Sequence, residues 1–124
     1  IIHATKILEP RFLQKFGRQI DILPTVMGIL NLSYVNNTFG IDLMREERPY
    51  IYFSADDRIG CLDEDYFYVY RTNGIETLYK YKLNDTKNYL TTYKSTSDSM
   101  KVYAFSMIQA AQWIVKNNKT NIEK

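Results

Sequence analysis

Residues able to perform chemistry are scarce in this chain of 124 residues, which contains one histidine, His3, and one cysteine, Cys61. A structural zinc site takes about four ligands, so these two residues alone cannot build a His/Cys metal cage. His3 is also distant from Cys61 in sequence, and a lone cysteine in a strand-like segment is typical of a small buried hydrophobe. Gly-rich phosphate loops and the GxSxG and HExxH patterns are absent. We therefore predict no catalytic residue and no metal ligand in this sequence.

Two acidic segments form the carboxylate clusters, Asp56-Asp57 and the Asp-Glu-Asp run at 63–65. A calcium loop alternates oxygen ligands over about 12 residues, with a central glycine and a closing glutamate. Neither segment has that pattern. We interpret both as turns whose Asp side chains accept hydrogen bonds from nearby backbone N–H groups. A weak metal or ligand site is the alternative.

An apolar segment at 20–32 is the first element that could position such residues. Asp21 is a predicted helix cap, and Pro24 falls in the first turn, where its missing N–H costs nothing. Gly28 in mid-helix indicates close packing against a neighbour. Apolar residues recur at helical spacing on one face and we expect this helix to be largely buried; they are Ile22, Val26, Ile29 and Leu30.

From Tyr50 onward the hydrophobic period changes to two, which predicts strands at 50–54, 58–62, 66–71 and 76–83. Asn73-Gly74 is a hairpin signal, so the four strands form an antiparallel meander. Residues 84–97 predict a short helix or an irregular loop. Ser97 or Asp98 caps a final helix that runs to about Lys116, with Met107 and Trp113 in the core. The predicted class is α+β, an antiparallel sheet of about four strands packed with a buried N-terminal helix and a C-terminal helix.

The composition of the chain excludes some classes of function. The net charge is +2 and the basic residues are interspersed, which argues against nucleic acid as a partner. Apolar runs are far shorter than the roughly 20 residues of a membrane span. Aromatic residues reach 15% and concentrate between Tyr50 and Tyr103. We interpret the tyrosines as the two faces of a small sheet. The alternative is a binding module that holds a glycan or peptide on the tyrosine-rich face between Tyr66 and Tyr81.

Three segments carry a resemblance. Gln19–Leu30 resembles the "IDxxPTLLxLxG" segment of the sulfatase/alkaline-phosphatase superfamily, in particular its lipoteichoic-acid-synthase-like branch of phosphoglycerol transferases. Ile1–Ala4 fits the strand that precedes this segment. Phe39–Leu43 is similar to the "FGxxLL" stretch that follows it. Leu78–Asp85 is similar to "LYDLxxDPxExxNL" without its Pro and Glu, and Tyr89-Leu90 takes the place of "NL".

The resemblance implies that the family's metal ligands, its Asp-His-Gly motif and its Thr, Ser or Cys nucleophile precede this chain. Residues 1–124 would then be one C-terminal subdomain without catalytic residues, in which 1–45 end the catalytic core and 46–124 form the sheet and last helix. The parent would be a membrane-anchored extracytoplasmic hydrolase or transferase using Mn, Mg, Zn or Ca. The implied partner is the upstream core of the same polypeptide. A dimer through the surface facing that core is the alternative assembly.

Overall fold

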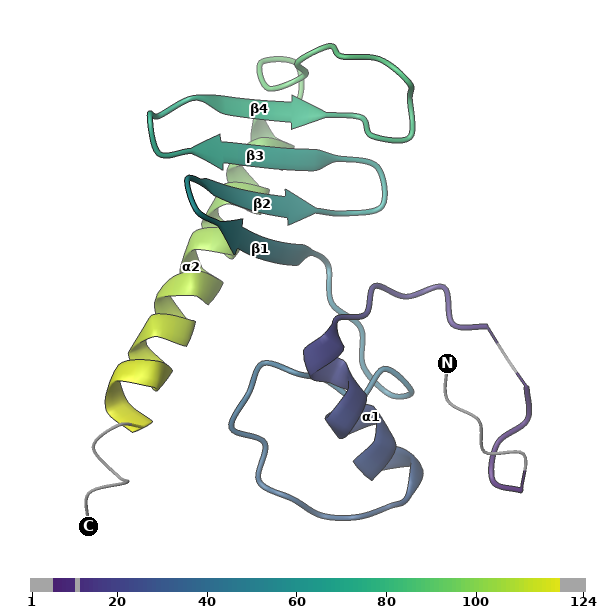
Figure 1. The fold of residues 1–124 in the computed structure, drawn as a ribbon. Coiled ribbons are helices and arrows are strands. Elements are labelled where there is room, and N and C mark those ends of the chain that lie inside the picture. The colour runs from purple at the N-terminus through teal and green to yellow at the C-terminus, as the bar shows by residue number, and fades with distance from the viewer. Residues whose placement is uncertain (1–5, 11, 119–124) are drawn as a thin grey trace. The chain divides into compact units, whose positions relative to one another are not determined.

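The computed structural model describes residues 6–10 and 12–118. The chain divides into two compact units, and the boundary falls between Arg48 and Pro49. Each unit is considered by itself. The second unit contains four strands and a long helix, and the first contains a short helix among loops (Figure 1). The strand expected at Ile1–Ala4, including His3, lies outside the described residues.

The second unit is built on an antiparallel sheet with the strand order β1-β2-β3-β4. Its helix, α2, spans Lys94–Asn118, so the predicted α+β class with about four antiparallel strands is confirmed. The strands follow one another through tight turns, which is why their spatial order equals their chain order. Their bounds are Ile51–Ala55 for β1, Arg58–Leu62 for β2, Phe67–Arg71 for β3 and Glu76–Tyr79 for β4.

The core of this unit lies between the sheet and α2. Tyr52, Cys61, Tyr68 and Leu78 are register partners across the four strands, and they therefore point to the same face. Met100 of α2 closes over this row and is fully buried. Burying one large apolar side chain stabilises a fold by roughly 1.5–3 kcal/mol, so this row and the helix above it hold the unit together. Figure 1 shows α2 running across one face of the sheet.

The last strand is shorter than predicted because the following loop takes over its pairing. Asn88 Oδ1 accepts from the Leu78 N–H at 3.0 Å, and the Tyr89 N–H donates to the Leu78 carbonyl at 2.8 Å. The chain turns directly after Tyr79, with a Leu83 N–H bond to the Lys80 carbonyl. Residues 80–83 therefore leave the sheet. The loop saturates the exposed edge of β4.

The predicted Asn-Gly hairpin turn is confirmed between β3 and β4. Gly74 has a φ of +83°, in the left-handed region that glycine adopts at little cost. Its N–H donates to the Arg71 carbonyl at 2.9 Å, and Arg71 N–H donates to the Ile75 carbonyl at 2.9 Å. This turn sets the register of the two strands that carry Tyr68 and Leu78.

The long helix begins earlier than predicted, and one of its two predicted core residues is exposed. It begins at Lys94, because Ser97 does not cap it but is buried and donates back to the Lys94 carbonyl at 2.8 Å. Met107 packs against the core as expected. Trp113 does not, since 67% of it is exposed. In the described part of the chain, neither helix combines the length and the hydropathy that crossing a bilayer requires.

The first unit contains a 3-10 turn, η1, at Gln19–Asp21 and the helix α1 at Ile22–Ile29. Gly28 confirms the predicted close packing, because a Cβ at this position would collide with the carboxylate of Asp42. Gly40 is equally constrained, since a Cβ there would collide with the Ile20 carbonyl. The helix is thus held close to residues 40–42.

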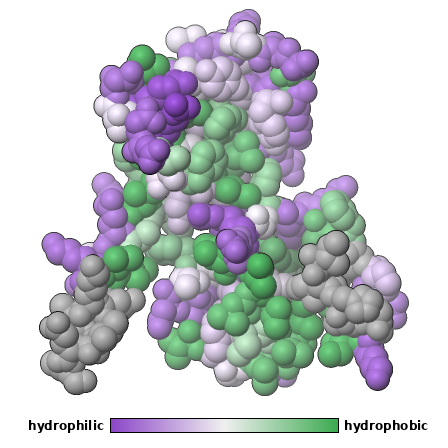
Figure 2. Space-filling view, viewed as in Figure 1, coloured by the Kyte–Doolittle hydropathy of each residue, from purple (hydrophilic) through white to green (hydrophobic). Residues whose placement is uncertain are grey.

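The expectation that α1 is largely buried is wrong. Its buried residues are Pro24 and Thr25, while Ile22 and Leu23 are each 58% exposed. The reason is the polar interior on its other side, where Thr25 Oγ1 accepts from the Leu43 N–H at 3.1 Å. Figure 2 shows hydrophobic residues gathered on the surface of this unit. The apolar face of α1 therefore points away from the unit's own interior.

Candidate functional site

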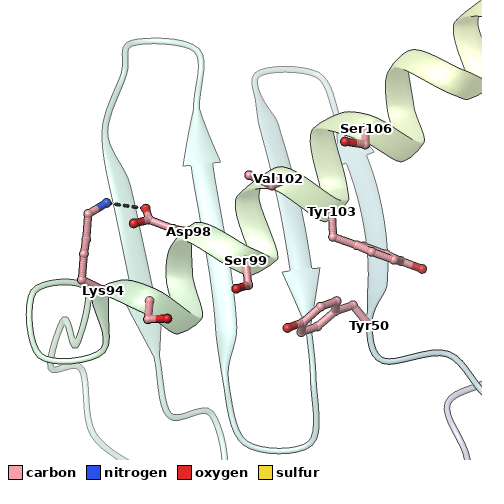
Figure 3. Close-up of a pocket in the computed structure, with 8 residues that line it drawn as sticks. Tyr50, Lys94, Asp98, Ser99, Val102, Tyr103 and Ser106 are labelled. Atoms are coloured by element: carbon pink, nitrogen blue, oxygen red, sulfur yellow. Dashed lines mark hydrogen bonds and ion pairs between the residues drawn. The ribbon is translucent and has the colours of Figure 1, made fainter.

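A hollow beside α2 is a candidate binding site of the second unit. It has a volume of about 890 Å³ and is open to solvent along the helix (Figure 3). Tyr50 comes from the residue directly before β1, and α2 contributes the remaining lining residues: Lys94, Ser95, Asp98, Ser99, Val102, Tyr103 and Ser106. We call this feature the α2 groove.

Two tyrosines form the aromatic end of the α2 groove. The rings of Tyr50 and Tyr103 meet edge-on, with centroids 5.1 Å apart, and Tyr103 also contacts the ring of the buried Tyr52 at 6.1 Å. Burial, followed by the charge of Asp63 and that of Cys61, raises the pKa of the Tyr50 phenol. The phenol is therefore a neutral hydrogen-bonding group at physiological pH, on a ring whose position the core determines.

The opposite end of the α2 groove is polar. Lys94 Nζ and Asp98 Oδ1 form an ion pair at 2.5 Å, one helical turn apart (Figure 3). The hydrogen bond to Asp98 is the main reason that the pKa of Lys94 is raised. Ser95, Ser99 and Ser106 are exposed on the helix surface along the groove, with Ser106 beyond Tyr103 (Figure 3). The groove thus combines aromatic surface, hydroxyl groups and a mutually neutralised ion pair.

A second cluster surrounds the ammonium group of Lys80, directly after β4. Lys80 Nζ lies 4.6 Å from the ring centroid of Tyr93, 5.2 Å from that of Tyr89 and 5.6 Å from that of Tyr66. It also donates to the Tyr93 hydroxyl at 3.0 Å, which lowers the pKa of Tyr93 and raises that of Lys80. Since cation–π contacts link the end of the sheet to the segment before α2, we interpret this tyrosine cage as a structural clamp.

A third polar cluster joins α2 to the last strand. Glu76 accepts from the Tyr68 hydroxyl at 2.8 Å and from Lys101 Nζ at 2.5 Å. Lys101, and then Tyr68, lower the pKa of Glu76, whereas burial raises that of Tyr68. All three groups are partnered, so this cluster satisfies the one polar atom of a fully buried tyrosine.

Both acidic segments lie in the tight connections between strands, and at 63–65 the Asp side chain accepts backbone hydrogen bonds as predicted. Asp63 Oδ1 accepts from the N–H groups of Asp65 at 2.8 Å and Tyr66 at 2.6 Å. Asp57 pairs with the neighbouring Arg58 at 3.1 Å. Among residues 6–10 and 12–118, no three His, Cys, Asp or Glu side chains are grouped as a metal site would require.

Cys61 is a buried hydrophobe, as its sequence context predicted. It is fully buried in the row beneath α2. Burial, with a contribution from Asp63, raises the pKa of its thiol to about 12. Because the thiolate is the reactive form, the side chain is inert in the folded protein.

The tyrosines between Tyr66 and Tyr81 do not form a flat exposed platform. Tyr68 is fully buried, and Tyr66 and Tyr70 are half-buried on the α2 side of the sheet. Tyr79 is paired in register with Phe67, on the opposite face. Tyr81 lies beyond the sheet and donates to the carbonyls of residues 63 and 64. The positions of these tyrosines therefore do not support the alternative function, in which they form a stacking surface for a glycan or peptide.

The α2 groove was not identified from the sequence. Small polar residues recur at positions 95, 99 and 106 on one side of α2, but the helix predicted from the sequence begins at 97 or 98 and leaves out Ser95. The sequence did not indicate that Tyr50 lies opposite these residues, because Tyr50 comes 45 residues before Ser95 in the chain.

In comparisons with known proteins, no protein-family model matches the sequence, and no curated protein matches it significantly.

Proposed function

We propose that this chain is the non-catalytic C-terminal portion of a metal-dependent sulfatase-like or phosphoglycerol-transferase-like enzyme. In this proposal it completes the fold of the enzyme and shapes the substrate cleft. The parent is extracytoplasmic and membrane-anchored, and its divalent ion and nucleophile are supplied upstream. The proposal rests on the three sequence resemblances and on one structural observation, the outward-facing apolar side of α1.

The apolar face of α1 is the observation that carries the proposal. Ile20, Ile22 and Leu23 line a hollow of about 400 Å³ whose surface is almost entirely apolar, and Leu30 and Leu32 are about half exposed. Large exposed apolar patches mark surfaces that another part of a protein covers. The upstream catalytic core of the same polypeptide is the partner that the resemblance implies.

Three residues of the first motif have a separate, internal role in this proposal. Asp21, Pro24 and Thr25 are buried, and the Asp21 carboxylate accepts from the N–H groups of Arg18 at 2.6 Å and Ile41 at 2.9 Å. These residues tie the loops around α1. The motif thereby holds an apolar face outward, as a segment that packs on a larger core requires.

One test of the proposal is an activity assay. The chain is incubated with an aryl sulfate and with a phosphodiester, each with Mn²⁺ or Zn²⁺. We expect no metal-dependent turnover. Turnover that depends on added metal would contradict the proposal, because it would require a nucleophile and metal ligands within these 124 residues.

A second test addresses the apolar face of α1. Leu23→Lys places a charge on that face, and Ser33→Lys places the same charge on an exposed polar position. In the complete enzyme encoded by the gene, we expect Leu23→Lys to reduce folded yield and turnover at least tenfold and Ser33→Lys to leave both unchanged. In the chain alone, both variants should keep the wild-type hydrogen exchange. Equal behaviour of the two variants in the complete enzyme would refute the proposed packing.

A further inference from the structure

We propose that the α2 groove binds a neutral carbohydrate, with the tyrosine end contacting the C–H face of a sugar ring and the helix contacting its hydroxyl groups. This site is independent of the proposed packing of α1. All of its lining residues belong to the unit that begins at Pro49.

The composition of the groove wall suits an amphipathic ligand. Binding sites for small molecules are mostly apolar, with a few polar groups that determine orientation. Here the rings of Tyr50 and Tyr103 and the exposed Val102 supply apolar surface. A pyranose ring presents C–H groups on its faces and hydroxyl groups at its rim, so it can use both kinds of surface at once. A wholly apolar ligand would leave the serine hydroxyl groups desolvated without partners.

The hydroxyl groups of the groove are available for a ligand. In the part of the chain that the structure describes, Ser95, Ser99 and Ser106 are exposed and none of their hydroxyl groups takes part in a hydrogen bond, whereas the buried Ser97 donates to the Lys94 carbonyl. Asp98 uses Oδ1 for Lys94 and keeps Oδ2 for a further donor. A sugar hydroxyl can donate to the carboxylate and accept from a serine.

Charge and backbone geometry select against other ligands. Lys94 is neutralised by Asp98 at 2.5 Å, so the groove has no unpaired cation for a phosphate or sulfate. An extended peptide needs backbone N–H and C=O partners, but the helix wall uses its own backbone groups within α2. A neutral polyol needs neither an unpaired charge nor a free backbone edge.

The side chains of the groove wall are small where an exposed helix usually carries long ones. Serine is a weak helix former, and Lys, Glu or Gln would favour the helix more. A long side chain at 95, 99 or 106 would project into the hollow beside Tyr50. Ser106 lies 11 positions after Ser95, so the helix rises roughly 16 Å between them, which is the length of about three linked sugar rings.

The test is an NMR titration of the intact chain with cellotriose, maltotriose and tri-N-acetylchitotriose. We expect at least one trisaccharide to bind with a Kd of about 0.1–10 mM, a range suited to a shallow site. Backbone shifts should centre on Tyr50, Ser99 and Tyr103. Absence of binding by all three at about 10 mM would overturn the proposal. Binding with shifts confined to other parts of the chain would overturn it equally.

Matched variants separate the groove from the helix. Ser99→Lys fills the groove at an exposed position while raising helix propensity, so the variant is expected to fold. Gln109→Lys adds the same side chain at an exposed position of α2 outside the groove. We expect at least a tenfold loss of affinity in Ser99→Lys and wild-type affinity in Gln109→Lys. Unchanged affinity in Ser99→Lys, or an equal loss in both variants, would refute a sugar site at the groove.

Discussion

Replacing Asp21 with asparagine tests how the first unit is held together. Asp21 is fully buried, and its carboxylate pairs with Arg48, whose side chain is 6% exposed. Arg48 Nη2 makes this contact, and among the described residues Arg48 Nε has no hydrogen-bond partner. Asp21→Asn keeps the shape of the side chain and removes its charge. The guanidinium of Arg48 is then left in the interior without a counter-ion.

The expected cost follows from the burial of this pair. Breaking a buried ion pair by removing one partner costs about 3–5 kcal/mol, because the remaining charge stays desolvated. Folded domains gain roughly 0.05–0.15 kcal/mol per residue, so the first unit holds only about 2–7 kcal/mol in total. The substitution should therefore remove most of its stability. The second unit has a separate core and should keep its own.

Native-state hydrogen exchange measures both units in one experiment. In Asp21→Asn, the amides of Ile41 and Leu43 should lose their protection, because they donate to Asp21 Oδ1 and to Thr25 Oγ1. The amides of β2 and β3 should be unchanged. Glu47→Gln, at an exposed carboxylate, is the control and should match wild type.

A double variant tests whether the unpaired charge of Arg48 or the changed side chain at position 21 causes the loss of stability. Asp21→Asn with Arg48→Met removes both charges and should cost less than Asp21→Asn alone, because no orphan charge remains. If Ile41 and Leu43 kept their protection in Asp21→Asn, the pair would not be needed for the fold of this unit. If the double variant lost more than the single one, the desolvated guanidinium would not be the cause.

Three further outcomes follow from the second unit. The depressed pKa of Glu76 means that its pairing with Lys101 contributes fully above its ordinary value of about 4.5 and is lost as the pH falls through the depressed pKa. Glu76→Gln should therefore lower stability by about 1 kcal/mol at pH 7 and little at pH 2, and an equal loss at both pH values in urea titrations would contradict this. Cys61 should resist iodoacetamide in the folded chain and react in urea; rapid labelling of the native protein would exclude the buried thiol. Met100→Ala leaves a cavity under α2 and should lower the free energy of unfolding by about 2–5 kcal/mol; a change below about 1 kcal/mol in urea unfolding would argue against its core position.

Much of the second unit was predictable because its signals are local. The period of two in the strands, the Asn73-Gly74 turn and the polar turn at 63–65 each depend on a few neighbouring residues. The register that these turns set then placed Tyr68 and Cys61 on one face. The end of β4 was not predictable in this way, because it depends on Asn88, which pairs with Leu78 from ten residues away.

The candidate sites depended on contacts that no local pattern contains. The tyrosine cage joins Lys80 to Tyr66 and Tyr93, which lie in three different segments. The α2 groove likewise needs Tyr50, which directly precedes β1, beside serines of α2. Sequence spacing predicted the helix that carries Ser99 and Ser106, but not its first turn with Ser95 and not the aromatic wall next to it.

By itself, the sequence determined the α+β class, the order of the elements, their approximate bounds and the inert character of Cys61. These follow from periodicity and turn residues, which act over a few positions. Tertiary structure alone decided which side of α1 is buried. An apolar stripe predicts an inward face, but in the first unit the interior is occupied by the paired charges of Asp21 and Arg48. Because a buried charge must lie against its partner, those contacts turn Ile22 and Leu23 outward.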